Sequence, residues 1–181
     1  MGIFTFRTPL LLLIVAGLAG CASGVKRTED ASKRDAYFAK GGKLANEVTI
    51  SLTKEAQAML SDNLKFDQNK LLTTVKRALD AKNLLAKTAD PALPKIEILV
   101  TEIRVRSNVS AVLFGFMAGD DRVVGDVIAR DPSGKELQRF TVSASYALGG
   151  IGGGQDETRM GWLYETFAKH TVEELTGGKK D

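Results

Sequence analysis

The sequence predicts a mixed α/β (α+β) domain: about four strands form one mixed sheet, and two helices pack on one of its faces as a two-layer sandwich. Four segments alternate apolar and polar residues, as half-buried strands do. Two longer segments carry apolar residues at helical spacing. Their order along the chain is strand, helix, three strands, helix. This order favours one parallel strand pair followed by an antiparallel meander.

The strands are expected at Glu47–Leu52, Lys95–Arg106, Arg122–Arg130 and Phe140–Leu148. The second strand changes phase, because its apolar residues alternate up to Val100, whereas Ile103 and Val105 take the opposite phase. Either a β-bulge near Thr101 or burial on both faces explains this change. Asp131–Gly134 is expected to join the last two strands, since Pro and Gly stand where a tight turn favours them.

The two helices are expected at Asp67–Leu85 and Glu157–Leu175. Asp67 is a favourable N-cap residue for the first helix. The prolines that follow this helix prevent its continuation into the next strand. Residues Thr53–Leu64 have apolar spacing that suits either a helical turn or a loop.

Residues 1–20 have the pattern of a signal peptide. Arg7 precedes the apolar run Leu10–Leu18, which is shorter than the roughly 20 residues needed to cross a bilayer. The run ends in Leu18-Ala19-Gly20-Cys21, which resembles the lipobox of bacterial lipoproteins. This resemblance implies cleavage before Cys21, a diacylglycerol thioether on its sulfur and an acyl amide on its new amino group. Two or three acyl chains anchor a protein stably in a membrane.

The residue after the lipobox cysteine bears on which membrane holds the anchor. In Gram-negative lipoproteins Asp at this position commonly retains the protein in the inner membrane, whereas this sequence has Ala22. We therefore expect a lipid anchor in the outer membrane, facing the periplasm. Residues 21–45 are then the lipidated cysteine and a flexible, polar tether, because the segment has little apolar surface to bury. Residues 46–177 form a single periplasmic domain.

The composition excludes several functional classes. Removal of the signal peptide takes away Arg7 and leaves 24 basic and 22 acidic residues, interleaved along the chain, which does not favour nucleic-acid binding. The single cysteine cannot form an internal disulfide. The sequence has one histidine and no carboxylate cluster with ligand spacing, so we expect neither a metal nor a cofactor. The Asp120-Asp121 pair is interpreted as part of a turn.

The second half of the chain resembles a family of small proteobacterial lipoproteins catalogued as domain of unknown function 4410. The shared features are an apolar stretch that closes in Ala118-Gly119, a strand, the Asp131–Gly134 turn, a second strand, the glycines of Gly149–Gly154 and a final helix. The resemblance covers Val48–Thr176 and is most specific over Leu113–Gly154. The sequence departs from the family pattern at Val112–Phe114, where an Arg often precedes the apolar stretch. The family has no assigned catalytic residue, so the resemblance implies a location and a fold without an activity.

Two further features are weak candidates for chemistry. The glycines of Gly149–Gly154 lie between a strand and a helix, but their offsets do not match a nucleotide-binding motif, and acidic residues follow them. We interpret this segment as a flexible loop. His170 is the only histidine, and as the base of a small envelope hydrolase it is the alternative to a residue on a helix surface.

Val109–Gly119 is the most unusual segment, apolar with two glycines, and is either a buried strand extension or an exposed contact surface. The predicted contact residues are Leu113, Phe114, Phe116 and Met117. Trp162 lies off the apolar stripe of the last helix and can extend this surface. The leading hypothesis is therefore a non-enzymatic binding or assembly module for an envelope complex, whose partner is an envelope protein. The alternatives are the hydrolase with His170, and a lipid-carrying module, which requires a cavity between helices and sheet.

Overall fold

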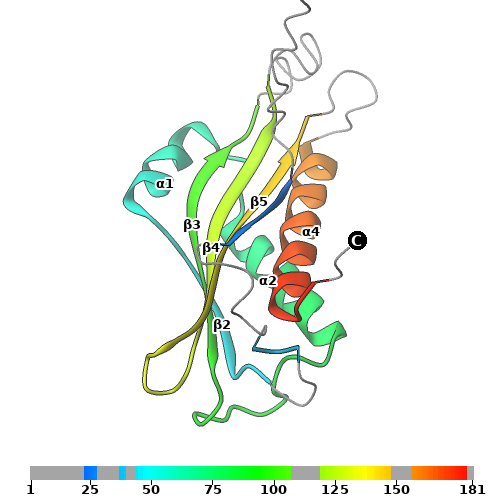
Figure 1. The fold of residues 1–181 in the computed structure, drawn as a ribbon. Coiled ribbons are helices and arrows are strands. Elements are labelled where there is room, and N and C mark those ends of the chain that lie inside the picture. The colour runs from blue at the N-terminus through cyan, green and yellow to red at the C-terminus, as the bar shows by residue number, and fades with distance from the viewer. Residues whose placement is uncertain (1–22, 28–36, 40–43, 107–118, 148–155, 179–181) are drawn as a thin grey trace, which may run out of the picture.

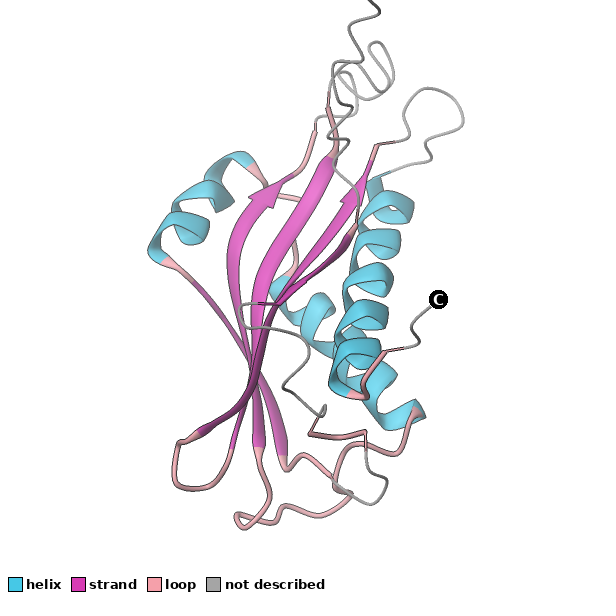
Figure 2. Ribbon diagram, viewed as in Figure 1, coloured by secondary structure: helices cyan, strands magenta, loops and turns pink. Residues whose placement is uncertain are grey.

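The structure is a computed structural model, and it describes residues 23–27, 37–39, 44–106, 119–147 and 156–178. These residues form a mixed α+β fold with one twisted five-stranded sheet (Figure 1, Figure 2). The strands are β1 (Gly24–Arg27), β2 (Glu47–Leu52), β3 (Lys95–Arg104), β4 (Asp121–Arg130) and β5 (Glu136–Tyr146). The helices are α1 (Lys54–Met59), which continues into a 3₁₀ turn at Leu60–Asp62, α2 (Gln68–Ala81) and α4 (Asp156–Leu175).

The strand order in the sheet is β1-β5-β4-β3-β2. Strands β2 and β3 are parallel and are joined through α1 and α2, whereas the remaining neighbours are antiparallel. This is the parallel pair and meander that the order of segments predicts. The register between β3 and β4 shifts between Val100 and Glu102, so a bulge near Thr101 is the correct one of the two explanations for the change of phase. The shift lets Val100 and Ile103 both be buried, at 0% and 2% exposure.

Strand β1 is the element that the sequence prediction lacked. It lies at the edge of the sheet and pairs with β5, with Gly24 opposite Ser143 and Arg27 opposite Phe140. Four of the residues predicted as tether are therefore part of the sheet. Phe38, from the same predicted tether, is 3% exposed, and its backbone N–H donates to the carbonyl of Leu175. Polar composition concealed these contacts because β1 is short and hydrogen-bonded mainly through its backbone.

The helix boundaries follow from side-chain caps and one left-handed residue. Asp67 caps α2 by accepting from the backbone N–H of Lys70 at 2.9 Å, as predicted. The helix ends at Ala81 rather than Leu85, because Asn83 has a φ of +55°. In the segment left open by the sequence, Thr53 caps the short helix α1.

Helices α2 and α4 pack together on one face of the sheet, whereas α1 lies beside β3, past the end of β2 (Figure 1, Figure 2). Side chains from this face and from the two helices form a continuous core. The middle of α4 approaches the sheet closely at Gly125: a Cβ there would lie 3.3 Å from Cζ of Phe167. The described residues between helices and sheet are thus packed together, which does not favour the lipid-carrying alternative.

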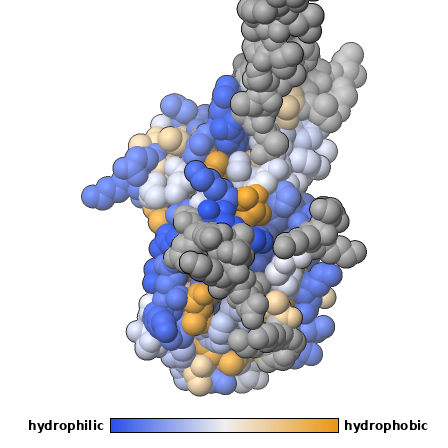
Figure 3. Space-filling model, in the orientation of Figure 1, coloured by the Kyte–Doolittle hydropathy of each residue, from blue (hydrophilic) through white to orange (hydrophobic). Residues whose placement is uncertain are grey.

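The opposite face of the sheet is polar. Its charged side chains pair across the strands, as in Arg130–Glu97 at 2.9 Å and Arg139–Asp126 at 3.4 Å. Hydrophilic residues predominate over the molecular face seen in Figure 3, where apolar residues form small separate patches. In the described part of this sheet face, these arginines lie beside carboxylates, which lowers their attraction for a polyanion.

Candidate functional site

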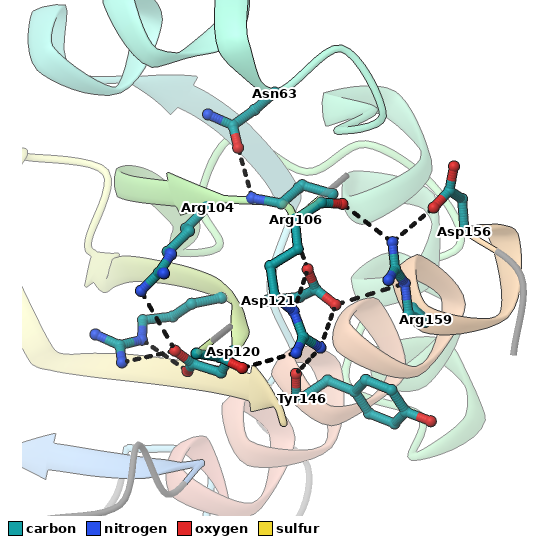
Figure 4. Close-up of polar contacts among 11 residues, drawn as sticks. Asn63, Arg104, Arg106, Asp120, Asp121, Tyr146, Asp156 and Arg159 are labelled. Atoms are coloured by element: carbon teal, nitrogen blue, oxygen red, sulfur yellow. Dashed lines mark hydrogen bonds and ion pairs between the residues drawn. The ribbon is translucent and has the colours of Figure 1, made fainter. Parts of the chain in front are cut away.

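Charged side chains gather at the end of the sheet where β3 ends, β4 begins, β5 ends and α4 begins (Figure 4). We call this group the arginine–aspartate cluster. Its members are Arg106, Asp120, Asp121, Arg122, Asp156 and Arg159. Four of the six side chains are at most 3% exposed, which is unusual for charged groups. Such burial is tolerated only where opposite charges and hydrogen bonds compensate the loss of hydration.

Asp121 is the centre of the cluster and is fully buried. Its Oδ1 accepts from the backbone N–H of Arg106 at 2.7 Å, and its Oδ2 accepts from Nη2 of Arg106 at 3.1 Å. The same guanidinium donates to the carbonyl oxygens of Gly119, at 2.7 Å, and Tyr146, at 3.1 Å. Arg106 therefore links the ends of β3, β4 and β5. Strand β3 ends at Arg104 rather than at the predicted Arg106, because the backbone N–H of Arg106 donates to the side chain of Asp121.

Arg159 connects this sheet end to helix α4. Its Nε lies 3.5 Å from Oδ2 of Asp121, and its Nη2 donates to Asp156 at 2.6 Å and to the backbone carbonyl of Arg106 at 3.1 Å. Lys65, from the loop before α2, adds a further cation 2.8 Å from Asp156. The first turn of α4 is therefore held by charge to both the sheet and the loop that precedes α2.

Asp120 forms the second part of the cluster, toward the polar face of the sheet. Its carboxylate accepts from Nε of Arg122 at 3.1 Å, and Nη1 of Arg104 lies 3.9 Å away. The pair was interpreted as part of a turn, but Asp121 is the first residue of β4, and both Asp120 and Asp121 are buried. One signal in the sequence pointed to this result: Asp121 has the same strand phase as Val123, which places its side chain on the core side of β4.

The geometry of the arginine–aspartate cluster favours a structural role over a catalytic one. Its carboxylates each face at least one arginine, and the central pair is closed off from solvent. A buried pair of this kind fixes how elements meet, whereas a catalytic carboxylate needs an open side toward a substrate. The cluster therefore fixes the packing of α4 against the end of the sheet.

A surface depression of about 510 Å³ lies beside the cluster, between the residues before α2 and the first turns of α4. Its floor includes Tyr164, whose hydroxyl oxygen accepts from the backbone N–H of Asp67 at 2.7 Å. Burial of the phenol raises the pKa of Tyr164 to about 12, from 10.0. The depression has acidic and basic side chains at its rim, with Lys65 paired to Asp156 across it.

The raised pKa of Tyr164 gives a pH-dependent prediction. Because the unfolded chain ionises this phenol near 10 and the folded chain near 12, folding stability is expected to fall as the pH rises through this interval. Titration of tyrosinate absorbance is expected to show one tyrosine ionising with a pKa of about 12. The Tyr164→Phe variant should lose that step, and its retention would show that another tyrosine carries the raised pKa.

The structure places only part of the residues singled out in the sequence. Cys21, the predicted contact residues Leu113, Phe114, Phe116 and Met117, and the Gly149–Gly154 loop lie outside the described residues. His170 lies on α4, where its Nδ1 is 3.4 Å from a carboxylate oxygen of Glu173, one turn away. This is a contact along one helix. Trp162 is 43% exposed.

Within the described part of the chain, no group of three or more potential metal-ligating side chains comes together. In that same part, no helix is both long and apolar enough to span a bilayer.

The fold and the cluster define a mixed α+β domain whose sheet end is joined to α4 by buried ion pairs. The chain belongs to the family described as domain of unknown function (DUF4410), whose model matches residues 27–150. Among curated proteins, no relative matches the sequence.

Two solved structures of the PelC dodecamer from Paraburkholderia phytofirmans are similar to this chain. The first, of a variant with one substitution, has a TM-score of 0.49 and 13% identity, covering 87% of this chain and 100% of its own. The second has a TM-score of 0.44 and 12% identity, with coverage of 88% and 100%.

Proposed function

We propose that this protein is a non-enzymatic lipoprotein of the outer membrane that faces the periplasm and binds another component of the cell envelope. Lipid on Cys21 anchors the domain. The contact surface comprises Leu113, Phe114, Phe116 and Met117. The partner is an envelope protein, and the domain holds it at the membrane surface.

The observation that carries this proposal is the lipobox Leu18–Cys21 at the end of a short apolar run. The small residues before the cysteine suit a lipoprotein signal peptidase, and the run is too short to remain as a transmembrane helix. The arginine–aspartate cluster supports a binding role, because it holds together the two chain ends from which the contact residues extend. The contact residues lie between Arg106 and Gly119 in the sequence, and the guanidinium of Arg106 donates to the carbonyl of Gly119.

The decisive experiment compares the wild-type chain with Cys21→Ser in living cells, each carrying a photoreactive residue at Phe116. The wild-type chain is expected to incorporate radiolabelled palmitate, to fractionate with the outer membrane and to give one discrete crosslinked adduct. Cys21→Ser should lose the label, the outer-membrane fraction and the adduct, because no lipid then confines the domain near its partner.

The matched control is Ala22→Asp, which keeps the lipidated cysteine but places Asp at the sorting position. It should retain the palmitate label and move toward the inner membrane. Palmitate label on Cys21→Ser, or its fractionation with the outer membrane, would contradict the lipid anchor. If the anchored chain gives no adduct and Phe116 is protected from solvent, the apolar segment belongs to the core and the contact surface is wrong.

A further inference from the structure

The first residue of the described chain is held at the edge of the sheet. The hydroxyl of Ser23 donates to the carbonyl of Ser145 at 3.1 Å and accepts from the N–H of Ser145 at 2.8 Å. Strand β1 continues this pairing along β5. Cys21 is two residues before Ser23, so their Cα atoms can be at most about 7 Å apart. A lipid on Cys21 is therefore tied by two residues of chain to Ser23, which bonds to the end of β5.

Strand β1 is also fixed to the helical layer. Arg27 donates from Nε and Nη2 to the two carboxylate oxygens of Glu174 on α4, the second bond at 3.0 Å. The backbone carbonyl of Glu174 accepts from the side-chain amide of Gln138, at 3.1 Å. These bonds join the edge strand to both layers of the domain. A lipid on Cys21 is thus joined, through two residues of chain, to an edge strand that is bonded to both layers of the domain.

A pair of aromatic residues, one exposed and one partly buried, lies beside the end of β5. Tyr146 is the residue after Ser145, and its ring contacts Trp162 of α4 in a tilted arrangement with centroids 5.1 Å apart. Trp162 is 43% exposed and is one of two large hydrophobic residues that are exposed in the described part of the chain, the other being Leu64. Tryptophan and tyrosine favour the membrane–water interface, where the ring body meets apolar atoms and the polar group meets water.

We propose that the corner formed by Ser23, Tyr146 and Trp162 rests on the lipid bilayer at headgroup depth. This proposal rests on the lipid anchor at Cys21 and adds an orientation to it. The acyl chains bring the corner to the membrane surface, and Trp162 inserts at the interface. The β4–β5 turn is at the other end of β5, about 33 Å away along 10 residue steps of strand, and projects into the periplasm.

The test uses Trp162 as a probe, because it is the only tryptophan of the chain. Lipidated full-length protein is purified from cells and reconstituted into vesicles of phosphatidylglycerol and phosphatidylcholine. The phosphatidylcholine carries bromine on its acyl chains close to the headgroup. We expect loss of most of the Trp162 emission relative to vesicles without bromine. The matched control is the double variant Trp162→Phe with Lys135→Trp, whose single tryptophan lies in the exposed β4–β5 turn and should keep its emission.

The outcomes separate this orientation from the anchor itself. If the protein floats with the vesicles but Trp162 is not quenched, the orientation is wrong and the lipid anchor stands. Equal quenching at Trp162 and at position 135 means that the domain has no fixed orientation, which also overturns the proposal. If mass spectrometry finds Cys21 unmodified and the protein does not float, the anchor fails and the orientation fails with it.

Discussion

Asp121→Ala is expected to lower the free energy of unfolding by about 3–5 kcal/mol, the range for breaking a buried ion pair by removing one partner. The variant leaves the guanidinium groups of Arg106 and Arg159 at the sheet end without their shared carboxylate. Both side chains are at most 3% exposed, so water cannot replace the lost charge without opening the junction. Equilibrium unfolding in urea, followed by far-UV circular dichroism, measures the change.

The control for this experiment is Asp126→Ala. Asp126 also contacts an arginine, Arg139 at 3.4 Å, but its side chain is 26% exposed on the polar face of the sheet. Its removal should lower the free energy of unfolding by about 1 kcal/mol or less, because solvent screens such pairs. Similar losses for the two variants would refute the view that Asp121 holds the cluster together.

Phe167→Ala should lower the free energy of unfolding by about 3–5 kcal/mol, because it removes a buried aromatic side chain and leaves a cavity. Phe167 is 0% exposed in the middle of α4, and its ring tip lies against Gly125 of β4. Because Gly125 has no side chain, α4 already lies close to the sheet at this point. The helix therefore has little room to move toward the sheet and fill the cavity that Phe167→Ala leaves. The same urea unfolding experiment measures this loss.

Leu64→Ala is the matched control, since Leu64 is also a large apolar residue but is 85% exposed. Its effect should stay within about 0.5 kcal/mol, as for most surface substitutions. A small loss for Phe167→Ala, comparable to that of Leu64→Ala, would mean that α4 is not packed on the sheet as described.

The local elements of the fold were predictable because short-range physics fixes them. The alternation of apolar and polar residues predicts the ends of β2, β3 and β4 to within two residues. Asp67 marks the start of α2, because its side chain caps a backbone N–H of that same helix. The bulge in β3 was also readable, because a change of apolar phase has few structural explanations. Strand β1 was missed, since a four-residue polar edge strand is stabilised by its pairing with β5 and has no pattern of its own.

The site depends on contacts that span the chain. Asp121 meets Arg159 across 38 positions of sequence, and Ser23 meets Ser145 across 122. No spacing rule links such residues, because their proximity is created only when the sheet and α4 assemble. The sequence by itself determined the types of the longer elements and the single mixed sheet, because patterns of neighbouring residues report them. Only the tertiary structure decided that Gly24–Arg27 enters the sheet and that buried arginines meet aspartates, since both follow from long-range packing.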